Sequence, residues 1–373
     1  IVSRGPRVFV ERIDISGNTT TMDRVIRRQF KIVEGDALNP REIRASAERI
    51  RALGFFGDVD LSTREGTSPN QTIVDVAVTE KPTGSLSFGA NYNSSIGIGV
   101  IASFREGNFL GRGQALSASI NTTANTKKLS FSFQEPAALA RDISLNIDLE
   151  YNRTDGNNAK YDTDSFDTSS MLGFPISTTE VLGLKGFWES ELLSDVTTGS
   201  NIILNESLQG RRSNFGLGYS YSFDNRRTGL NPKSGTFIKF GQEFAFTGKD
   251  PFLRTNMKLG GETYVLNEAV KLTGIFDFGA LIFDGSSASR VTDRYFLGSN
   301  MFRGFAAGGM GPREKNVAGS PLINDALGGN YYAVARFETQ SPLGLPEEYG
   351  LELGAFFDAG SVWGLDKGSL NTA

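Results

Sequence analysis

From residue 83 onward, hydrophobic and polar residues alternate with a period of two. In the clearest stretch, the apolar positions Ile143, Leu145, Ile147, Leu149 and Tyr151 alternate with the polar positions Ser144, Asn146, Asp148, Glu150 and Asn152. Successive side chains of a β-strand point to opposite faces, so this pattern predicts strands with one apolar and one polar face. We predict about thirteen strands, near residues 84–92, 96–105, 114–122, 127–135, 142–153, 162–176, 180–193, 212–224, 235–247, 252–266, 270–283, 330–340 and 349–363.

A soluble all-β domain and a transmembrane β-barrel both produce such alternation. Here several polar faces carry full charges, such as Asp148 and Glu150, or consist of Gly and Ser, and no helix separates the strands. A water-filled interior and a lipid-facing exterior account for this pattern, and a closed sheet leaves no unpaired edge in lipid. We therefore predict a transmembrane antiparallel β-barrel, with the soluble all-β domain as the alternative.

The strand count also bears on the ends of the chain. Bacterial single-chain barrels normally have an even number of strands, and this sequence stops at Ala373 just after a predicted strand, without a closing aromatic residue. We expect that C-terminal strands are missing. The chain begins at Ile1 without an initiator Met or a signal peptide, which predicts a processed or trimmed product.

The first eighty residues follow a different pattern and predict a small α/β module. The expected elements are a strand at 8–15, a helix near 22–30, a helix from Pro40 to Leu53, and strands near 58–63 and 72–80. Asn39 is the expected N-cap of the second helix, with Glu42 in the capping-box position. The order is β-α-α-β-β, and Lys81-Pro82 marks the boundary. An exposed edge of this sheet is able to accept an extended peptide.

Composition excludes much enzyme chemistry. The 373 residues include neither Cys nor His, so no thiolate, disulfide or imidazole base is available. The 38 basic and 42 acidic residues nearly balance, which argues against nucleic-acid binding. No window approaches the ~18 consecutive apolar residues of a transmembrane helix. We expect neither an enzyme nor a bound metal or cofactor.

One connection between strands, residues 285–329, is too long for a tight turn and is typical of a functional loop. It contains the motif Phe302-Arg303-Gly304-Phe305. Strand alternation turns Glu338 and Asp358 to the polar faces of the next two strands. If the loop folds into the barrel, Arg303 is able to bridge both carboxylates with charge-assisted hydrogen bonds. The alternatives are an ordinary surface arginine, acids that only wet the interior, and an acid–base dyad, which the lack of a recognisable substrate pocket disfavours.

Taken together, four motifs in this order resemble the BamA family of outer-membrane insertases: Ser16-Gly17-Asn18, Leu53-Gly54-Phe55-Phe56, Phe302-Arg303-Gly304-Phe305 and Phe357-Asp358-Ala359-Gly360. The loop motif of the family usually begins with Val, where this sequence has Phe302. The resemblance implies that residues 8–81 are the last, barrel-proximal POTRA domain and that residues 1–7 end an upstream linker or POTRA domain. It also implies that residues 82–373 form a C-terminally incomplete barrel of a 16-strand family.

The same resemblance implies a function and its residues. Arg303 contacts the inward acids Asp358 and Glu338, and the first barrel strand forms a lateral gate through Gly84, Ser85, Leu86, Ser87, Phe88, Gly89, Ala90, Asn91 and Tyr92. The implied activity is ATP-independent folding and insertion of outer-membrane β-barrel proteins by seam opening and strand augmentation. The implied partners are unfolded clients, a BamD-like accessory lipoprotein at the POTRA domain, and membrane lipid with lipopolysaccharide. The implied location is the outer membrane, with the POTRA domain in the periplasm. A related POTRA-barrel translocator, TamA-like or of the two-partner secretion type, and a passive porin remain alternatives.

Overall fold

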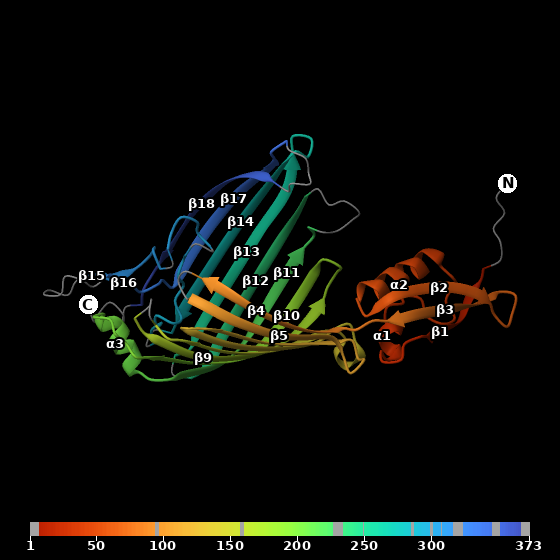
Figure 1. The fold of residues 1–373 in the computed structure, drawn as a ribbon, viewed down its shortest axis with the longest axis horizontal. Coiled ribbons are helices and arrows are strands. Elements are labelled where there is room, and N and C mark those ends of the chain that lie inside the picture. Colours follow the sequence, from red (N-terminus) through yellow and green to blue (C-terminus); the bar gives the residue numbers. More distant parts are fainter. Residues whose placement is uncertain are drawn as a thin grey trace. The chain divides into compact units, whose positions relative to one another are not determined.

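The computed structural model describes residues 7–93, 97–156, 160–226, 234–248, 250–284, 287–298, 301–306, 308–315, 324–344 and 351–366 (Figure 1). The expected linker at 1–7 and the C-terminal end of the expected barrel therefore lie largely outside the described residues. The chain forms two compact units. The first comprises Ile1–Gly89, Ile101–Ser119 and Phe131–Pro136, and the second comprises Ala90–Val100, Ile120–Ser130 and Ala137–Ala373.

The first unit contains the predicted α/β module. Its elements are β1 (Phe9–Ser16), α1 (Asp23–Arg27), α2 (Pro40–Ala52), β2 (Phe56–Glu65) and β3 (Gln71–Glu80). The strand order is β1-β3-β2, with β1 parallel and β2 antiparallel to the central β3. Apolar residues of both helices and all three strands form one buried core, which includes Val25, Ile26, Ile50, Val74 and Val76.

The start of α2 follows the expected local chemistry in part. The side chain of Asn39 caps the helix by accepting a 3.1 Å hydrogen bond from the backbone N–H of Arg41. Glu42 does not complete a capping box, because its carboxylate turns to Arg49 of the same helix, 3.7 Å away. The first helix is shorter than the predicted 22–30 and ends at Arg27.

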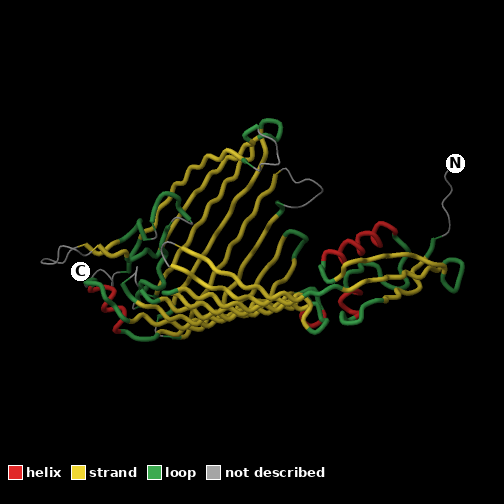
Figure 2. Tube along the Cα trace, in the orientation of Figure 1, coloured by secondary structure: helices red, strands yellow, loops and turns green. Residues whose placement is uncertain are grey.

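Thirteen strands form one large sheet (Figure 2). They are β4 (Gly84–Asn93), β5 (Gly97–Phe109), β6 (Gln114–Thr123), β7 (Thr126–Glu135), β8 (Ser144–Thr154), β9 (Asp162–Pro175), β10 (Glu180–Ser194), β11 (Arg212–Asp224), β12 (Ser234–Thr247), β13 (Phe252–Val265), β14 (Val270–Phe283), β17 (Tyr331–Pro342) and β18 (Glu352–Trp363). Each strand pairs with its neighbours in chain order, so the order begins at β4 and ends at β18. The predicted strand positions are confirmed to within a few residues at each end.

The two faces of this sheet differ as the alternation predicted. One face is apolar and remains exposed, as for Phe88 at 74% and Phe357 at 64%. The other face, called here the charged face, carries ion pairs such as Lys185 with Glu243. An exposed apolar face opposite a charged face is the arrangement of a wall with lipid on one side and water on the other.

Several described elements were not predicted. They are the 3₁₀ turn η1 (Ala138–Ala140), the helix α3 (Asn201–Leu208) between β10 and β11, and the antiparallel pair of β15 (Arg313–Lys315) and β16 (Asn324–Ala326) inside the long loop. No helix among the described residues is long and apolar enough to cross a membrane.

Within the first unit, the module is joined to the turn that follows β5. The buried side chain of Asn108 donates a 2.8 Å hydrogen bond to the hydroxyl of Thr21, and the backbone N–H of Met22 donates to the carbonyl of Gly111 at 2.8 Å. Gly111 has a φ of +68°, and a Cβ there would lie 2.0 Å from the carbonyl oxygen of Thr20. This close approach of two backbones requires glycine.

Candidate functional site

The candidate site lies in the second unit, where the long loop meets the charged face of β17 and β18. The first part of the loop is tied to its last residue, just before β17, because Tyr295 and Gly329 exchange two backbone hydrogen bonds of 2.9 and 3.0 Å. The Tyr295 ring packs edge-to-face on Tyr332 of β17, with the ring centroids 4.8 Å apart. Gly279 of β14 leaves room for this pair, since a Cβ there would lie 2.3 Å from the Tyr332 ring.

Arg303 is seated between two carboxylates. Its Nε and Nη2 donate to Asp358 at 2.8 and 2.6 Å, its backbone N–H donates to the same carboxylate at 3.0 Å, and its Nη1 donates to Glu338 at 2.5 Å. Asp358 lies on β18 opposite Arg336 of β17. Glu338 lies two residues further along β17. The guanidinium thus joins both strands through charge-assisted bonds, one of them bidentate. We call this arrangement the arginine seat.

Aromatic rings complete the arginine seat. The guanidinium carbon lies 3.9 Å from the ring centroid of Phe356, a cation–π contact that the sequence analysis did not identify. Phe302 is buried, and its ring meets that of Phe305 edge-to-face at 5.1 Å. Gly304 between them has a φ of +83°, a backbone conformation that favours glycine, so the tight turn explains this position of the motif.

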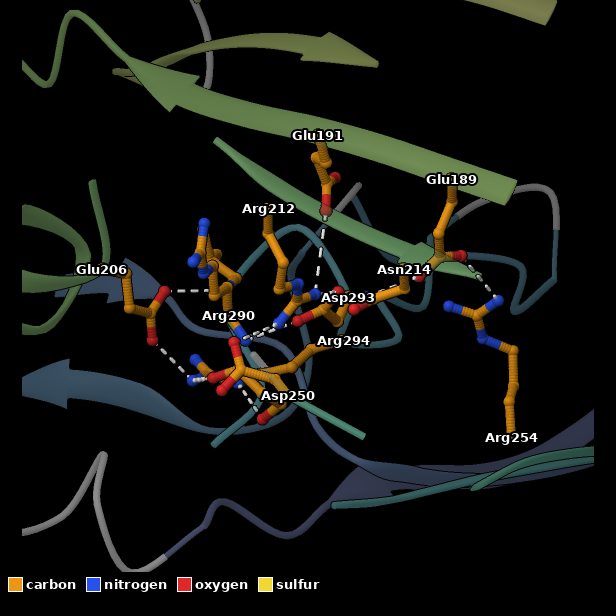
Figure 3. A network of polar contacts seen from close by, with 12 residues as sticks. Glu189, Glu191, Glu206, Arg212, Asn214, Asp250, Arg254, Arg290, Asp293 and Arg294 are labelled. Atoms are coloured by element: carbon orange, nitrogen blue, oxygen red, sulfur yellow. Dashed lines mark hydrogen bonds and ion pairs between the residues drawn. The ribbon is translucent and has the colours of Figure 1, made fainter. Parts of the chain in front are cut away.

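A second polar cluster joins the loop to other parts of the same unit (Figure 3). Arg212 at the start of β11 contacts Asp293 of the loop, and their side chains are only 2% and 3% exposed. Arg294 pairs with Glu206 of α3 at 2.5 Å. Strand alternation does not predict this cluster, although the charged segment Arg290–Arg294 offered a signal.

The predicted gate strand is β4, and it stands at one end of the strand order. Leu86, Phe88 and Tyr92 expose their side chains on its apolar face. The side chain of Asn91 lies outside the described set. The predicted site residues therefore fall into two groups. One group forms the arginine seat on β17 and β18, and the other lies on β4, at the opposite end of the strand order.

The chemistry of the arginine seat is electrostatic. Both carboxylates are occupied by one guanidinium, which makes the seat suited to holding a loop in place. No group of three or more Asp or Glu side chains in the described ranges is arranged to hold a metal ion.

A small α/β module that leads directly into a large antiparallel sheet, with one lipid-facing and one charged face, defines a transmembrane β-barrel protein with an N-terminal POTRA-type domain. The Omp85 superfamily domain matches residues 108–373, and the POTRA model, described as a surface antigen variable number repeat, matches residues 8–81. The chain belongs to the Omp85 superfamily. The predicted fold class, a β-barrel preceded by a β-α-α-β-β POTRA domain, is confirmed.

Named relatives support the predicted resemblance to BamA. The chain is 30% identical over 359 residues to the outer membrane protein assembly factor BamA of Neorickettsia risticii, covering 96% of this chain and 47% of that protein. It is 24% identical over 374 residues to BamA of Nitratidesulfovibrio vulgaris, covering 96% and 44%. It is 27% identical over 354 residues to the sorting and assembly machinery component 50 homolog A of Xenopus laevis, covering 90% and 71%. The chain thus spans about half the length of the bacterial relatives.

Solved structures share the fold. The crystal structure of BamA from Haemophilus ducreyi lacking POTRA domains 1–3 matches with a TM-score of 0.81 at 22% identity, covering 96% of this chain and 73% of that one. CdiB from Acinetobacter baumannii matches with a TM-score of 0.58 at 12% identity, covering 95% and 63%.

Proposed function

We propose that this chain forms the catalytically inert, ATP-independent core of an insertase that folds β-barrel proteins into the bacterial outer membrane. The observation that carries the proposal is that β4, the first strand of the large sheet, pairs with β5 alone among the described strands. A terminal strand offers a row of backbone N–H and C=O groups to an incoming strand. In lipid each unpaired group costs several kcal/mol, so pairing with a client strand is strongly favoured.

The arginine seat supports this proposal by its location. Arg303 bridges β17 and β18, the strands at the other end of the order, on their charged face. It holds the long loop against these two strands. No nucleophile or cofactor is required, because folding of the client supplies the free energy.

The proposed partners follow from the same mechanism. The clients are unfolded outer-membrane β-barrel proteins, and the wall contacts lipid and lipopolysaccharide. The POTRA domain lies in the periplasm, where its sheet edge and charged helices are accessible to an accessory lipoprotein of the BamD kind. The names of the bacterial relatives, outer membrane protein assembly factors, support the outer-membrane setting.

A polypeptide translocator with a POTRA domain and a barrel is the second candidate, because the same fold serves it equally. The two functions place the substrate differently. A client of an insertase pairs with β4, whereas a translocated chain passes the charged face of internal strands. A passive porin needs neither the POTRA domain nor the arginine seat.

Cross-linking separates these functions. The chain contains no Cys, so Ser87→Cys in β4 and Ser220→Cys in β11 each introduce a single thiol. Ser220 is the matched control, because it is a serine of an internal strand that is paired on both sides. With the full-length protein in liposomes, any cysteine outside this chain being replaced first, a client carrying one Cys in a terminal strand should form disulfides at position 87 and not at 220. Equal yields, or a preference for 220, would overturn the insertase proposal.

A further inference from the structure

The helix α3 depends on the long loop for its stability. It has only eight residues, too few to be stable alone in water. Its residues Ile202 and Ile203 are buried in a cluster with Val291 and Leu327, both of the long loop. Its other side exposes Leu204 at 43% and Leu208 at 76%. The helix therefore packs its inner side on the loop and leaves its outer side accessible.

The N-terminal end of α3 is fixed by an acidic side chain of the loop. The N-cap hydroxyl of Ser200 accepts a 3.1 Å hydrogen bond from the N–H of Ile203 and contacts the carboxylate of Glu314 in β15. The N–H of Ile202 donates to the same carboxylate at 3.4 Å. A buried carboxylate at this end also interacts favourably with the helix dipole.

The second anchor lies near the C-terminal end of α3 (Figure 3). The carboxylate of Glu206 pairs with Nη2 of Arg294 at 2.5 Å and accepts a 2.7 Å hydrogen bond from the N–H of Val291. The Arg294 side chain is 0% exposed. Beyond the helix, Arg290 donates to the carbonyl of Gly210 at 2.7 Å. Arg294 also donates to the carbonyl of Leu327 at 3.2 Å, so the ion pair with Glu206 is one of several contacts that hold this buried guanidinium, and loss of the Glu206 charge weakens the anchor.

The anchors and the arginine seat belong to the same loop. Arg294 is followed by Tyr295, whose ring packs edge-to-face on Tyr332, and by Leu297, which is 1% exposed in a cluster with Phe302. Arg303 comes directly after Phe302. Packed side chains of this kind transmit a displacement because they leave little free volume.

We propose that α3 positions the arginine seat, with Glu206 and Glu314 as positioning residues. While α3 is docked, the loop is held at two points in sequence: before Arg303 through Glu206, and after Arg303 through Glu314. The guanidinium then stays between Glu338 and Asp358. When α3 is released, the loop leaves the seat. Any effect of α3 on client insertion rests on the proposed function. The positioning of the arginine seat by α3 does not.

Distances between spin labels test the positioning directly. Ala306→Cys in the loop and Leu353→Cys on the apolar face of β18 are both exposed, and the chain has no other Cys. A second pair, Leu208→Cys with Leu353→Cys, reports on α3 itself. The full-length protein in micelles should give a narrow distribution for both pairs. Glu206→Gln should broaden both distributions and reduce the population at the seated distance several-fold.

Two further variants keep the result interpretable. Glu314→Gln should act in the same direction and replaces Glu206→Gln if that variant does not fold. Glu180→Gln is the matched control. Glu180 of β10 accepts a 2.7 Å hydrogen bond from Tyr221 of β11, at the ends of these two strands that are opposite to α3. It should leave both distributions unchanged.

The proposal is overturned if α3 moves while the distance from residue 306 stays narrow, or if neither distance changes in Glu206→Gln, Glu314→Gln and the double variant. Client insertion measured on the same samples separates the two proposals. An altered distance with unchanged insertion refutes the role of the seat in insertion and leaves the positioning by α3 in place.

Discussion

The carboxylate of Asp358 accepts three hydrogen bonds from a single residue, Arg303: one from its backbone N–H and two from its guanidinium. A side chain that binds both the backbone and the charge of its partner fixes the position and the orientation of that residue. Because β18 carries Asp358, the loop is tied to this strand at one defined register.

Removing either member of this pair should impair client insertion. Hydrogen bonds to charged groups contribute about 1.5–3 kcal/mol, so Arg303→Ala and Asp358→Ala should each release the loop. Since both changes destroy the same interaction, the double variant should lose little more than either single one. Insertion rates in liposomes provide the measurement, with Glu352→Ala, an exposed acid of the same strand, as the control. Fully additive losses would show that the two residues act independently.

Substitution of Gly304 tests the backbone of the motif. A Cβ at this position would meet no atom within 4 Å, so Gly304→Ala is opposed only by the φ of +83°. That strain costs roughly 1–2 kcal/mol, and the loop should become about five to thirty times more accessible to protease. Gly304→Asn should be milder, because Asn tolerates this conformation. If Ala and Asn both leave the cleavage rate unchanged, the turn does not require its observed conformation.

Glu80 should make the stability of the POTRA domain depend on pH. Burial raises the pKa of Glu80, but hydrogen bonds from Thr21, Thr19 and Thr20 outweigh this effect and lower the pKa from 4.5 to about 2. A carboxylate with a depressed pKa stabilises the fold above its ordinary pKa, and this contribution disappears as the pH falls from about 4.5 to about 2. Wild type and Glu80→Gln should therefore differ in urea stability at neutral pH and converge in strong acid. A constant difference between wild type and Glu80→Gln across this pH range would contradict the assignment.

Asn108 should control the contact between the POTRA domain and the turn after β5. Its amide donates to Thr21 at 2.8 Å and accepts from the N–H of Gly113 at 2.7 Å, so Asn108→Ala leaves buried polar groups without these partners. A cost of about 1–3 kcal/mol is expected. Hydrogen exchange of the peptide containing Met22 should accelerate, because its N–H is bonded to Gly111 in the same contact. Asn70→Ala, in an exposed turn, is the control, and equal exchange in both variants would argue against the role of Asn108.

The strand positions could be predicted because alternation is a local property of each segment. The arginine seat could be predicted in the same way, since the alternation places Glu338 and Asp358 on the charged face. The geometry of these contacts agrees with the prediction, and their functional role remains a prediction. Phe356 was missed because it is an aromatic residue on a face expected to be polar, and only the folded loop shows that its ring meets a guanidinium.

The helix α3 could not be predicted for a different physical reason. Its eight residues carry little amphipathic signal, and its stability comes from contacts with residues far along the chain, such as Glu206 with Arg294. Long-range ion pairs leave no periodic trace in a sequence. Glu42 illustrates the limit of the capping rule, because its carboxylate lies beside Arg49 of the same helix in place of the expected capping box.

The central strand of the POTRA sheet ends at Glu80, and the first strand of the barrel begins at Gly84. Three residues, Lys81, Pro82 and Thr83, connect these two strands and span at most about 11 Å when fully extended. A force that displaces β3 would therefore reach the first strand of the large sheet through very little intervening backbone.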